Sequence, residues 1–265
     1  MLLQDKNAVI YGGGGAIGGA VARAFAREGA KVFLAGRTLA KLDRVASEIA
    51  AAGGAAETAE LDALDEQAVD DHAEAVAGKA GAIDIALNAV GIVHDQGTPF
   101  TELAFEDYAQ PITAYTRTNF LTAKAVARHM VKQGSGVILT LSTPGARMTG
   151  QGFLGNGVSS AAVEAFSRIL AGELGGSGIR VVCLRPHAIP EAVSTSHTRE
   201  VFSGFAERAG TTVDAMLDER LRAGTLLGRL PTLAEVADSA AFVASDGAGA
   251  MTGAIVNLSC GSLVD

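Results

Sequence analysis

The chain has 265 residues, enough for one large α/β domain with a sizeable core. Its formal net charge is −8 and it has no cluster of basic residues, which argues against a nucleic-acid-binding protein. Residues 8–22 are uncharged but are broken by glycines, so they predict neither a signal peptide nor a membrane span. We therefore expect a cytoplasmic protein with no membrane partner.

The first predicted strand is followed by a run of glycines and then by a helix. The run extends from Gly12 to Gly15, and the helix after it has Ile17 and Val21 on its apolar face and ends at Gly29. Glycines at such a junction permit a tight turn and let backbone N–H groups approach a pyrophosphate at the helix N-terminus. Because a strand precedes the run and a helix follows it, the pattern predicts a dinucleotide site.

The end of the second predicted strand, at Gly36 and Arg37, indicates the type of dinucleotide. An acidic side chain at position 36 would bind a ribose 2′-hydroxyl, whereas Gly36 leaves room for Arg37 to bind a 2′-phosphate. Such a charge-assisted hydrogen bond contributes about 1.5–3 kcal/mol, or about 10- to 150-fold in affinity. We predict NADP as the cofactor, with NAD possible. The alternative interpretation is an exposed arginine in the first turn of a helix capped by Thr38.

Short apolar stretches alternate with helical patterns along the whole chain, which predicts βαβ units and a parallel sheet. We predict an α/β fold, namely a single-domain, Rossmann-type, doubly wound parallel seven-stranded sheet with helices on both faces, spanning residues 1–265. The least regular region, at about 190–230, is expected to form a mobile substrate lid. The predicted strands are residues 8–11, 31–35, 56–61, 83–88, 136–141, 180–184 and 254–258.

The cysteines and histidines predict neither a disulfide nor a metal site. Cys183 and Cys260 lie in apolar, strand-like stretches and are interpreted as small core residues. The five histidines are scattered and no Cys-x-x-Cys motif occurs, so no set of metal ligands is expected.

Further motifs resemble the short-chain dehydrogenase/reductase family, and the resemblance covers nearly the whole chain. They are Leu61-Asp62-Ala63 after the third strand, Asn88-Ala89-Val90-Gly91 after the fourth, and the run from residue 227 to residue 253. The glycine loop fits the family pattern except at Tyr11 and Ala16. The resemblance implies that the cofactor is bound by Gly12, Gly14, Gly15, Ile17, Gly18, Arg37, Asp62, Ala63, Asn88, Gly91 and Ile189.

The catalytic positions of that family carry different residues here. In the family a tyrosine transfers the proton, a lysine lowers the pKa of that tyrosine and holds the ribose, and a serine positions the substrate oxygen. The resemblance places Asn156 at the tyrosine, Ser160 at the lysine and Thr143 at the serine, and it places Tyr115 at a supporting asparagine. No lysine follows Lys132. An amide does not donate a proton near neutral pH, so either another group supplies the proton or catalysis is lost.

Two side chains are candidates for a replacement proton donor. His187 follows the sixth strand, at the edge of the sheet where α/β proteins bind ligands, and an imidazole can protonate an alkoxide at physiological pH. Its alternative role is to narrow the pocket as a turn residue. Tyr115 is the second candidate, although a tyrosine without a cationic neighbour keeps its usual high pKa, so packing is the alternative. His94 and Asp95 follow the fourth strand in a loop near the same edge of the sheet; solvated loop residues are the preferred interpretation, and a role as a substitute proton donor is the alternative.

These observations leave two main hypotheses. The first is an NADP(H)-binding oxidoreductase of the short-chain dehydrogenase/reductase type that acts on a small carbonyl or alcohol with an altered proton donor. The second is a catalytically inactive, nucleotide-binding relative that serves as a sensor or as the inactive partner in an oligomer. A cofactor-free lyase similar to halohydrin dehalogenases is weaker, because those enzymes lose the glycine loop and keep the tyrosine.

The helix after Asn156 predicts self-association. It carries an apolar face, and the resemblance implies that this helix lies in the interface of a homodimer or homotetramer. The alternative is that the face packs entirely on the sheet. The residues of this face are Ala161, Ala162, Ala165, Phe166, Ile169 and Leu170.

Overall fold

The computed structural model describes residues 1–264, and the side chains of all of these except 219–221. Its seven strands form one sheet in the order β3-β2-β1-β4-β5-β6-β7, and every neighbouring pair is parallel. The predicted α/β fold with a seven-stranded parallel sheet is therefore confirmed. The strands are β1 (Asn7–Tyr11), β2 (Lys31–Gly36), β3 (Ala55–Glu60), β4 (Ile85–Asn88), β5 (Gly136–Leu141), β6 (Ile179–Pro186) and β7 (Ile255–Leu258).

Two strand boundaries differ from the sequence prediction for identifiable reasons. Strand β4 begins at Ile85 rather than at residue 83, because the side chain of Gln133 bonds both the N–H and the C=O of Ile83, at 3.0 and 2.9 Å. Strand β6 runs on to Pro186 because it lies between β5 and β7 and pairs with β7 as far as Leu258.

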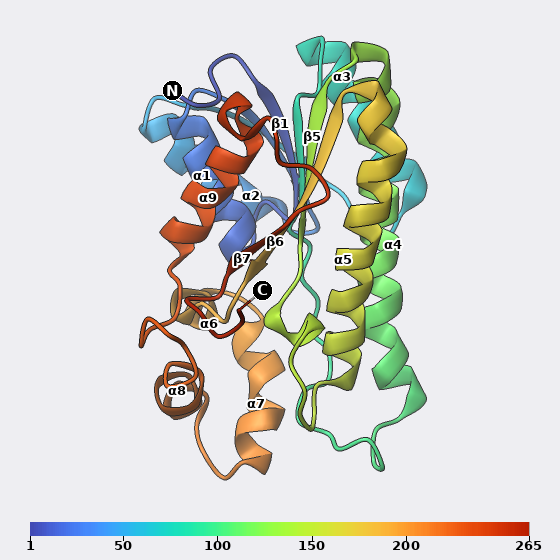
Figure 1. Ribbon diagram of the computed structural model, residues 1–265. Helices are drawn as coiled ribbons and strands as arrows, with labels where there is room; N and C mark the ends of the chain where they lie inside the picture. The colour runs from blue at the N-terminus through green and yellow to red at the C-terminus, as the bar shows by residue number, and fades with distance from the viewer. Residues whose placement is uncertain (265) are drawn as a thin grey trace.

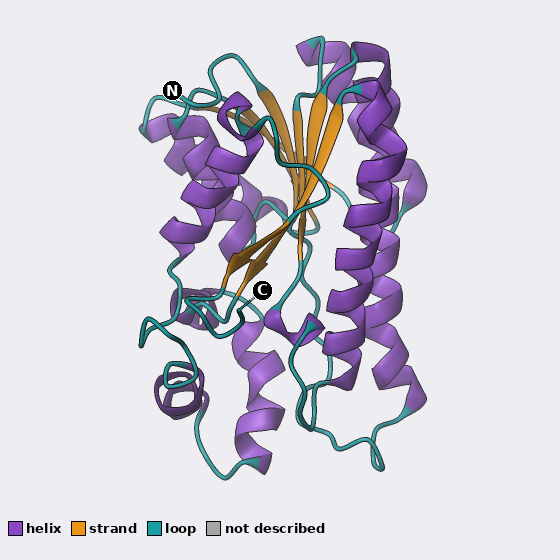
Figure 2. Ribbon diagram, in the orientation of Figure 1, coloured by secondary structure: helices purple, strands orange, loops and turns teal. Residues whose placement is uncertain are grey.

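Helices cover both faces of the sheet, which is the layer between them in Figures 1 and 2. One face is covered by α1 (Ala16–Arg27), α2 (Leu39–Ala51) and α9 (Leu233–Ala244), and the other by α3 (Glu66–Ala80), α4 (Phe105–Gln133) and α5 (Leu154–Leu174). Strand β1 shows why both faces are covered, since Ala8 and Ile10 pack into the first layer and Val9 and Tyr11 into the second. Fully burying a side chain such as Ile or Val contributes about 1.5–3 kcal/mol, so both helical layers stabilise the sheet.

The helices next to the first two strands end as their sequences predict. Helix α1 ends at Arg27, and Gly29 just beyond it has a φ of +95°, the left-handed conformation that glycine adopts readily. Helix α2 ends at Ala51 and is followed by Gly53 with a φ of +84°. Thr38 is the N-cap residue of α2, although its side chain makes no capping hydrogen bond.

The region at about 190–230 is mostly helical, so the expectation of the least regular segment is wrong. It contains α6 (Pro190–Thr195), α7 (Thr198–Arg208), α8 (Val213–Ala215) and the π-helical turn η3 (Met216–Leu221), which lie beyond the carboxyl ends of the strands in Figure 1. These helices form because they have a small core of their own, to which Val193, Ala206, Val213, Leu217 and Leu230 contribute. We call residues 190–221 the lid, after the predicted role in covering a substrate, which stays a prediction.

The remaining short elements are the 3-10 turns η1 (Pro144–Ala146), η2 (Gly175–Ser177) and η4 (Asp246–Ala248). Cys183 and Cys260 are both free thiols. Across the part of the chain that the structure describes, no helix combines the length and the apolar character needed to cross a membrane.

Candidate active site

A cavity of about 600 Å³ lies at the carboxyl ends of the strands, between the sheet and the lid. Such a position is where ligands bind in open α/β sheets. Of the sixteen candidate residues named from the sequence, all except Gly18 line this cavity. We call the part near the glycine loop, Arg37 and Asp62 the cofactor half, and the part near Thr143 and Tyr115 the substrate half.

The glycine loop that predicted a dinucleotide site has the backbone geometry for one. Gly12 has a φ of +80°, and an added Cβ would clash with the carbonyl of Ala89. Gly15 is the N-cap residue of α1, and neither a capping side chain nor an acidic residue occupies the first turn of this helix. The N–H groups of that turn therefore face the cavity as donors for an anion, and the helix dipole favours a pyrophosphate there.

Two glycines of the loop have roles other than direct contact with a cofactor. A Cβ at Gly18 would clash with the carbonyl of Gly12, so this glycine allows the helix to pack on the loop, and Gly18 itself lies outside the cavity. A Cβ at Gly14 would lie 2.9 Å from the Cβ of Lys41, so Gly14 admits the second helix. Ala16 begins α1 without a positive φ, which is why a methyl group is accepted there.

The cofactor half carries the charged side chains of the cavity. Among the described lining residues these are Arg37, Lys41 and Asp62. Arg37 was predicted from the sequence, but Lys41 was missed, although its position one helical turn after Arg37 is a signal that could have found it. Asp62 accepts a hydrogen bond from the N–H of Leu64 at 2.9 Å through one carboxylate oxygen. The other oxygen of Asp62 can still accept from an amino group.

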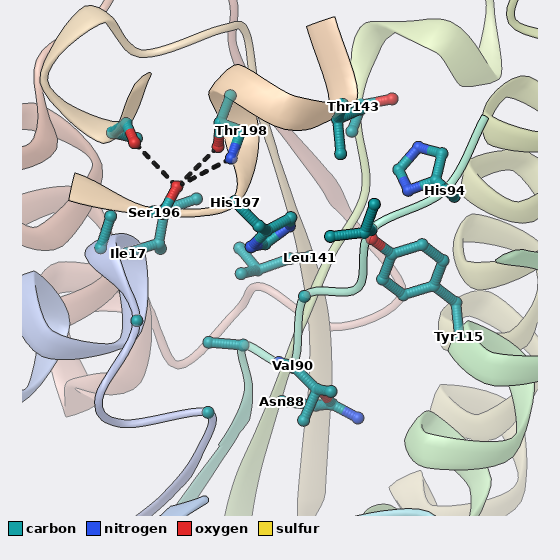
Figure 3. Close-up of a pocket in the computed structure, with 18 of the residues that line it drawn as sticks. Ile17, Asn88, Val90, His94, Tyr115, Leu141, Thr143, Ser196, His197 and Thr198 are labelled. Atoms are coloured by element: carbon teal, nitrogen blue, oxygen red, sulfur yellow. Dashed lines mark hydrogen bonds between the residues drawn. The ribbon is translucent and has the colours of Figure 1, made fainter. Parts of the chain in front are cut away.

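Asn88 and Gly91 shape the floor between the two halves. The Asn88 side chain is buried, donates to the hydroxyl of Thr122 at 3.2 Å and accepts from the N–H of Val90 at 3.0 Å. It therefore fixes the turn after β4 through protein contacts. A Cβ at Gly91 would clash with the ring of His197, a lid residue that Figure 3 shows near the centre of the cavity. Ile189 packs beneath this region in one apolar cluster with Ile17.

The substrate half contains a chain of hydrogen bonds between three of the predicted catalytic positions. Thr143 follows β5, and Asn156 and Ser160 lie one turn apart on α5. The hydroxyl of Thr143 donates to Asn156 Oδ1 at 3.2 Å and lies 2.9 Å from the hydroxyl of Ser160. The N–H of Gly145 also donates to Thr143 Oγ1 at 3.2 Å. Because Thr143 uses its own proton towards Asn156, Ser160 is the donor in the second bond.

His94 joins this chain, so its interpretation as a solvated loop residue is wrong. The residue is only 9% exposed and lines the cavity. Its Nδ1 atom lies 3.0 Å from the carbonyl of Ile92, and its Nε2 atom lies 3.3 Å from Asn156 Nδ2 and 3.1 Å from Gln96 Nε2. Sequence spacing gave no signal for this contact, because 62 residues separate His94 from Asn156.

Tyr115 lies beside His94, with the two rings edge to face at a centroid distance of 6.0 Å (Figure 3). It lines the cavity, as expected for the position that it occupies. Burial raises the pKa of Tyr115, and a backbone hydrogen bond from Ile92 lowers it by less. The phenol therefore stays protonated at neutral pH and packs against the imidazole.

His187 lines the cavity from the end of β6, but its imidazole is poorly placed to exchange a proton. The N–H of Ala188 donates to His187 Nδ1 at 2.6 Å, so the ring carries its proton on Nε2. Burial lowers the pKa of His187 to about 4, so the cationic form that could protonate an alkoxide is scarce at neutral pH.

A buried ion pair supports the floor of the substrate half. Glu164, one helical turn after Ser160, accepts from the hydroxyl of Ser142 at 2.9 Å and from Arg185 Nη1 at 3.3 Å. The Arg185 and Glu164 side chains are 1% and 7% exposed. This pair ties α5 to the ends of β5 and β6, and it therefore fixes the strand end from which Thr143 projects. Within the described residues, no three His, Cys, Asp or Glu side chains gather as they would around a metal ion.

Comparisons with known proteins show which family shares this sequence and fold. The family model described as enoyl-(acyl carrier protein) reductase matches residues 14–262. D-threitol dehydrogenase of Mycolicibacterium smegmatis is 27% identical over 95% of this chain and 90% of its own length. Tropinone reductase-like 2 of Erythroxylum coca is 32% identical over 92% of this chain and 85% of its own length.

A solved structure similar to this one contains a nicotinamide cofactor. The structure of 7α-hydroxysteroid dehydrogenase complexed with NADH and 7-oxo glycochenodeoxycholic acid has a TM-score of 0.83 and 26% identity, over 99% of this chain and 96% of the other. The matching family model, the curated relatives and the shared fold together show that this chain belongs to the short-chain dehydrogenase/reductase family of oxidoreductases.

Proposed function

We propose that the protein is an NADP(H)-dependent oxidoreductase that acts on a small, uncharged carbonyl or alcohol with a proton donor other than the usual tyrosine. The observation that carries this proposal is the cavity itself. One continuous space joins the uncapped N-terminus of α1, the cationic pair Arg37 and Lys41, and the hydroxyl of Thr143. When bound, a nicotinamide supplies the hydride acceptor or donor for this reaction.

The preference for NADP rests on charge at the end of β2. Arg37 and Lys41 both line the cavity, and Gly36, the last residue of β2, presents no carboxylate that would repel a phosphate. Two cations on one side of a ribose favour a 2′-phosphate, since each charge-assisted hydrogen bond contributes about 1.5–3 kcal/mol. Lys41 supplies the second cation that the glycine loop lacks.

The uncharged character of the substrate follows from the side chains of the substrate half. Its polar groups are amides, hydroxyls and imidazoles, and no charged side chain among the described residues lines it. A charged substrate group would lose its hydration there without gaining an opposite charge. The lid adds apolar side chains, which suit a substrate with a hydrocarbon body, and these are Val201, Phe202, Phe205 and Met216.

A second candidate function is a catalytically inactive, nucleotide-binding protein. It is favoured by the saturated hydrogen bonds of Thr143, whose proton goes to Asn156 and whose oxygen accepts from Ser160 and Gly145. Such a protein would bind the dinucleotide through the same loop and act as a sensor or as the inactive subunit of an oligomer. Turnover of a carbonyl or alcohol separates the two candidates.

We also propose that the protein forms a homodimer or homotetramer through α4 and α5. The predicted apolar face of α5 is split in the structure, because Phe166 and Leu170 pack on the core while Ile169 is 65% exposed. Ile169 and the exposed Val158 of α5, with Phe120 and Val131 of α4, leave apolar side chains on the outer surface of both helices. A second copy of the chain would remove them from water.

The first test is calorimetric titration of the purified protein with NADPH and, separately, with NADH. Binding of NADPH at least tenfold tighter than NADH supports the cofactor assignment. Turnover is then measured with neutral ketones and alcohols. Binding of neither dinucleotide contradicts both candidate functions, whereas binding without turnover of any probe favours the inactive one.

A further inference from the structure

The substrate half contains an imidazole whose proton positions are fixed by its neighbours. A carbonyl oxygen only accepts hydrogen bonds, so the 3.0 Å contact from His94 Nδ1 to the carbonyl of Ile92 places the proton of the neutral ring on Nδ1. Nε2 then carries a lone pair, which accepts from the amide groups of Asn156 and Gln96. The lone pair is therefore directed at two side chains that line the cavity, at the end of the chain of hydrogen bonds that starts at Ser160.

We propose that His94 is the catalytic acid–base residue, whose Nε2 atom accepts the hydroxyl proton of an alcohol substrate and returns it when the carbonyl is reduced. This inference rests on the proposed function and supplies the proton donor that it leaves unnamed. A base held by a third group through its other nitrogen is a recurring arrangement in acid–base catalysis. Here the third group is the carbonyl of Ile92.

The arrangement around Asn156 shows where the substrate oxygen binds. Asn156 accepts from Thr143 through Oδ1 and donates to His94 through Nδ2, so its amide spans the gap between the hydroxyl and the imidazole. An alcohol oxygen needs the same two partners, because it accepts from a hydroxyl and donates its own proton to a base. The substrate hydroxyl therefore replaces the amide between Thr143 and His94, while Asn156 turns aside.

The proton balance needs no further side chain. As the alcohol is oxidised, its O–H proton goes to His94 Nε2, and a nicotinamide held in the cofactor half by the glycine loop and Arg37 would accept the hydride from the adjacent carbon. The C–H and O–H bonds break, and a C=O bond forms. The imidazolium keeps its Nδ1 proton on the carbonyl of Ile92, and the Thr143 hydroxyl donates to the oxygen that becomes the carbonyl. Reduction reverses each transfer.

His187 and Tyr115, the two other candidates, do not combine a fixed protonation state with a lone pair that can accept a proton from a substrate. The Nδ1 lone pair of His187 accepts from the backbone N–H of Ala188 at 2.6 Å, whereas the partners of His94 Nε2 are side-chain amides that can turn aside for a substrate. The Tyr115 phenol is buried and bonded to the backbone of Ile92, and its raised pKa keeps it from acting as a base. Tyr115 instead holds the His94 ring edge to face.

The charges around His94 favour its neutral form at rest. Burial lowers the pKa of His94 most strongly, and His197 from the lid lowers it further, while Asp95 in the same loop and the carbonyl of Ile92 raise it. Tyr115, the titratable group that faces it from α4, is uncharged. A neutral imidazole is the form that accepts a proton, so alcohol oxidation should slow as the pH falls and His94 becomes protonated.

The experiment compares wild-type protein with His94→Gln, His94→Ala and His187→Gln. The control is His129→Gln, because His129 lies on α4 away from the cavity and contacts Glu74 at 3.6 Å. Turnover is measured with NADP⁺ and the neutral alcohols cyclohexanol and 1-phenylethanol, and in reverse with NADPH and the matching ketones. NADPH binding is measured calorimetrically for every variant, so that loss of folding or of the cofactor site is detected.

We expect His94→Gln to lose about 100- to 10,000-fold in turnover, the usual contribution of a general acid–base group. NADPH binding should be unchanged, and the fall in oxidation rate at low pH should disappear. Free imidazole added to His94→Ala should restore part of the turnover, whereas His129→Gln should match the wild type.

Other outcomes overturn the inference in distinguishable ways. If His94→Gln is as active as the wild type, or if only His187→Gln loses turnover, His94 is not the acid–base residue, while the proposed function stands. A loss in His94→Ala that imidazole does not rescue, with an unchanged pH profile in His94→Gln, shows a structural role only. If the wild type turns over none of the probes in either direction, the proposed function fails and this inference fails with it.

Discussion

The cofactor half and the substrate half of the cavity bind through different parts of the chain. In the cofactor half, the backbone of the glycine loop and the N-terminus of α1 line the cavity, and glycines such as Gly12 are required by a positive φ or by a close backbone approach. In the substrate half, side chains from three segments, represented by His94, Thr143 and Asn156, meet through hydrogen bonds.

This difference explains why the two halves can change independently. A backbone site depends on a local conformation that few residue types permit, so its pattern stays recognisable. A side-chain site depends on which segments the fold brings together, so one acid–base group can be replaced by another from a different segment. Here a loop histidine reaches the position next to Asn156.

The largest expected effect is at the floor of the substrate half. Glu164→Leu should destabilise the protein by about 3–5 kcal/mol, because it leaves Arg185 buried without this carboxylate. Urea unfolding measures the free-energy change. The control is Glu48→Leu, which removes the exposed pair of Glu48 with Arg23 and should cost about 1 kcal/mol or less. If both variants lose the same free energy of unfolding, the buried pair does not stabilise the substrate half more than an exposed pair would.

The next largest effect tests the backbone of the cofactor half. Gly12→Ala should cost about 2–4 kcal/mol, because it adds the strain of a positive φ to a clash with the carbonyl of Ala89. Gly53→Ala is matched in φ, at +84° against +80°, but its Cβ would meet no atom within 4 Å, so only strain of about 1 kcal/mol is expected. Thermal or urea unfolding compares them, and a Gly53 variant as unstable as the Gly12 variant would contradict the role of close approach.

Charge in the cofactor half is tested by Arg37→Gln and Lys41→Gln. Each should weaken NADPH binding by about 10- to 150-fold, because each removes one charge-assisted hydrogen bond to a 2′-phosphate. Binding of NADH should change little in both variants. Calorimetric titration gives the four affinities. Parallel losses for NADH and NADPH would mean that the two side chains do not recognise the 2′-phosphate.

The smallest effect is the pH dependence of stability from buried histidines. His187 and His72 have pKa values lowered by burial to about 4, so the unfolded chain binds protons that the folded chain excludes at pH values between that figure and the usual value near 6.5. Their contribution is fully present above the unfolded pKa and is lost as the pH falls towards 4. For each of the two histidines, the free energy of unfolding should be about 2 kcal/mol lower at pH 5 than at pH 7.

The variant His187→Gln isolates the contribution of His187 to the pH dependence of the free energy of unfolding. Its stability, measured by urea unfolding at the two pH values, should fall by about 2 kcal/mol less than that of the wild type. The same pH dependence in both proteins would mean that His187 is not buried in the neutral form.

The sequence by itself determined the sheet, its helices and most of the cofactor half. Alternating apolar strands and helices, the glycine run and the Gly36-Arg37 step are local patterns, because a strand, a turn or a helix cap depends on residues close together in the chain. The predicted strand boundaries agree with the structure to within one or two residues, and at Ile83 a distant side chain, that of Gln133, accounts for the difference.

The sequence also named positions of the substrate half, such as Thr143 and Asn156, but only the tertiary structure decided how their side chains are connected. The contact of His94 with Asn156, the pair of Glu164 with Arg185 and the helical lid depend on segments far apart in sequence that the parallel sheet brings to one edge. Burial, which no local pattern reveals, also determines which histidine keeps a lone pair towards the cavity and which has its pKa lowered to about 4. Chemistry that depends on desolvation and on long-range contacts is fixed only when the chain has folded.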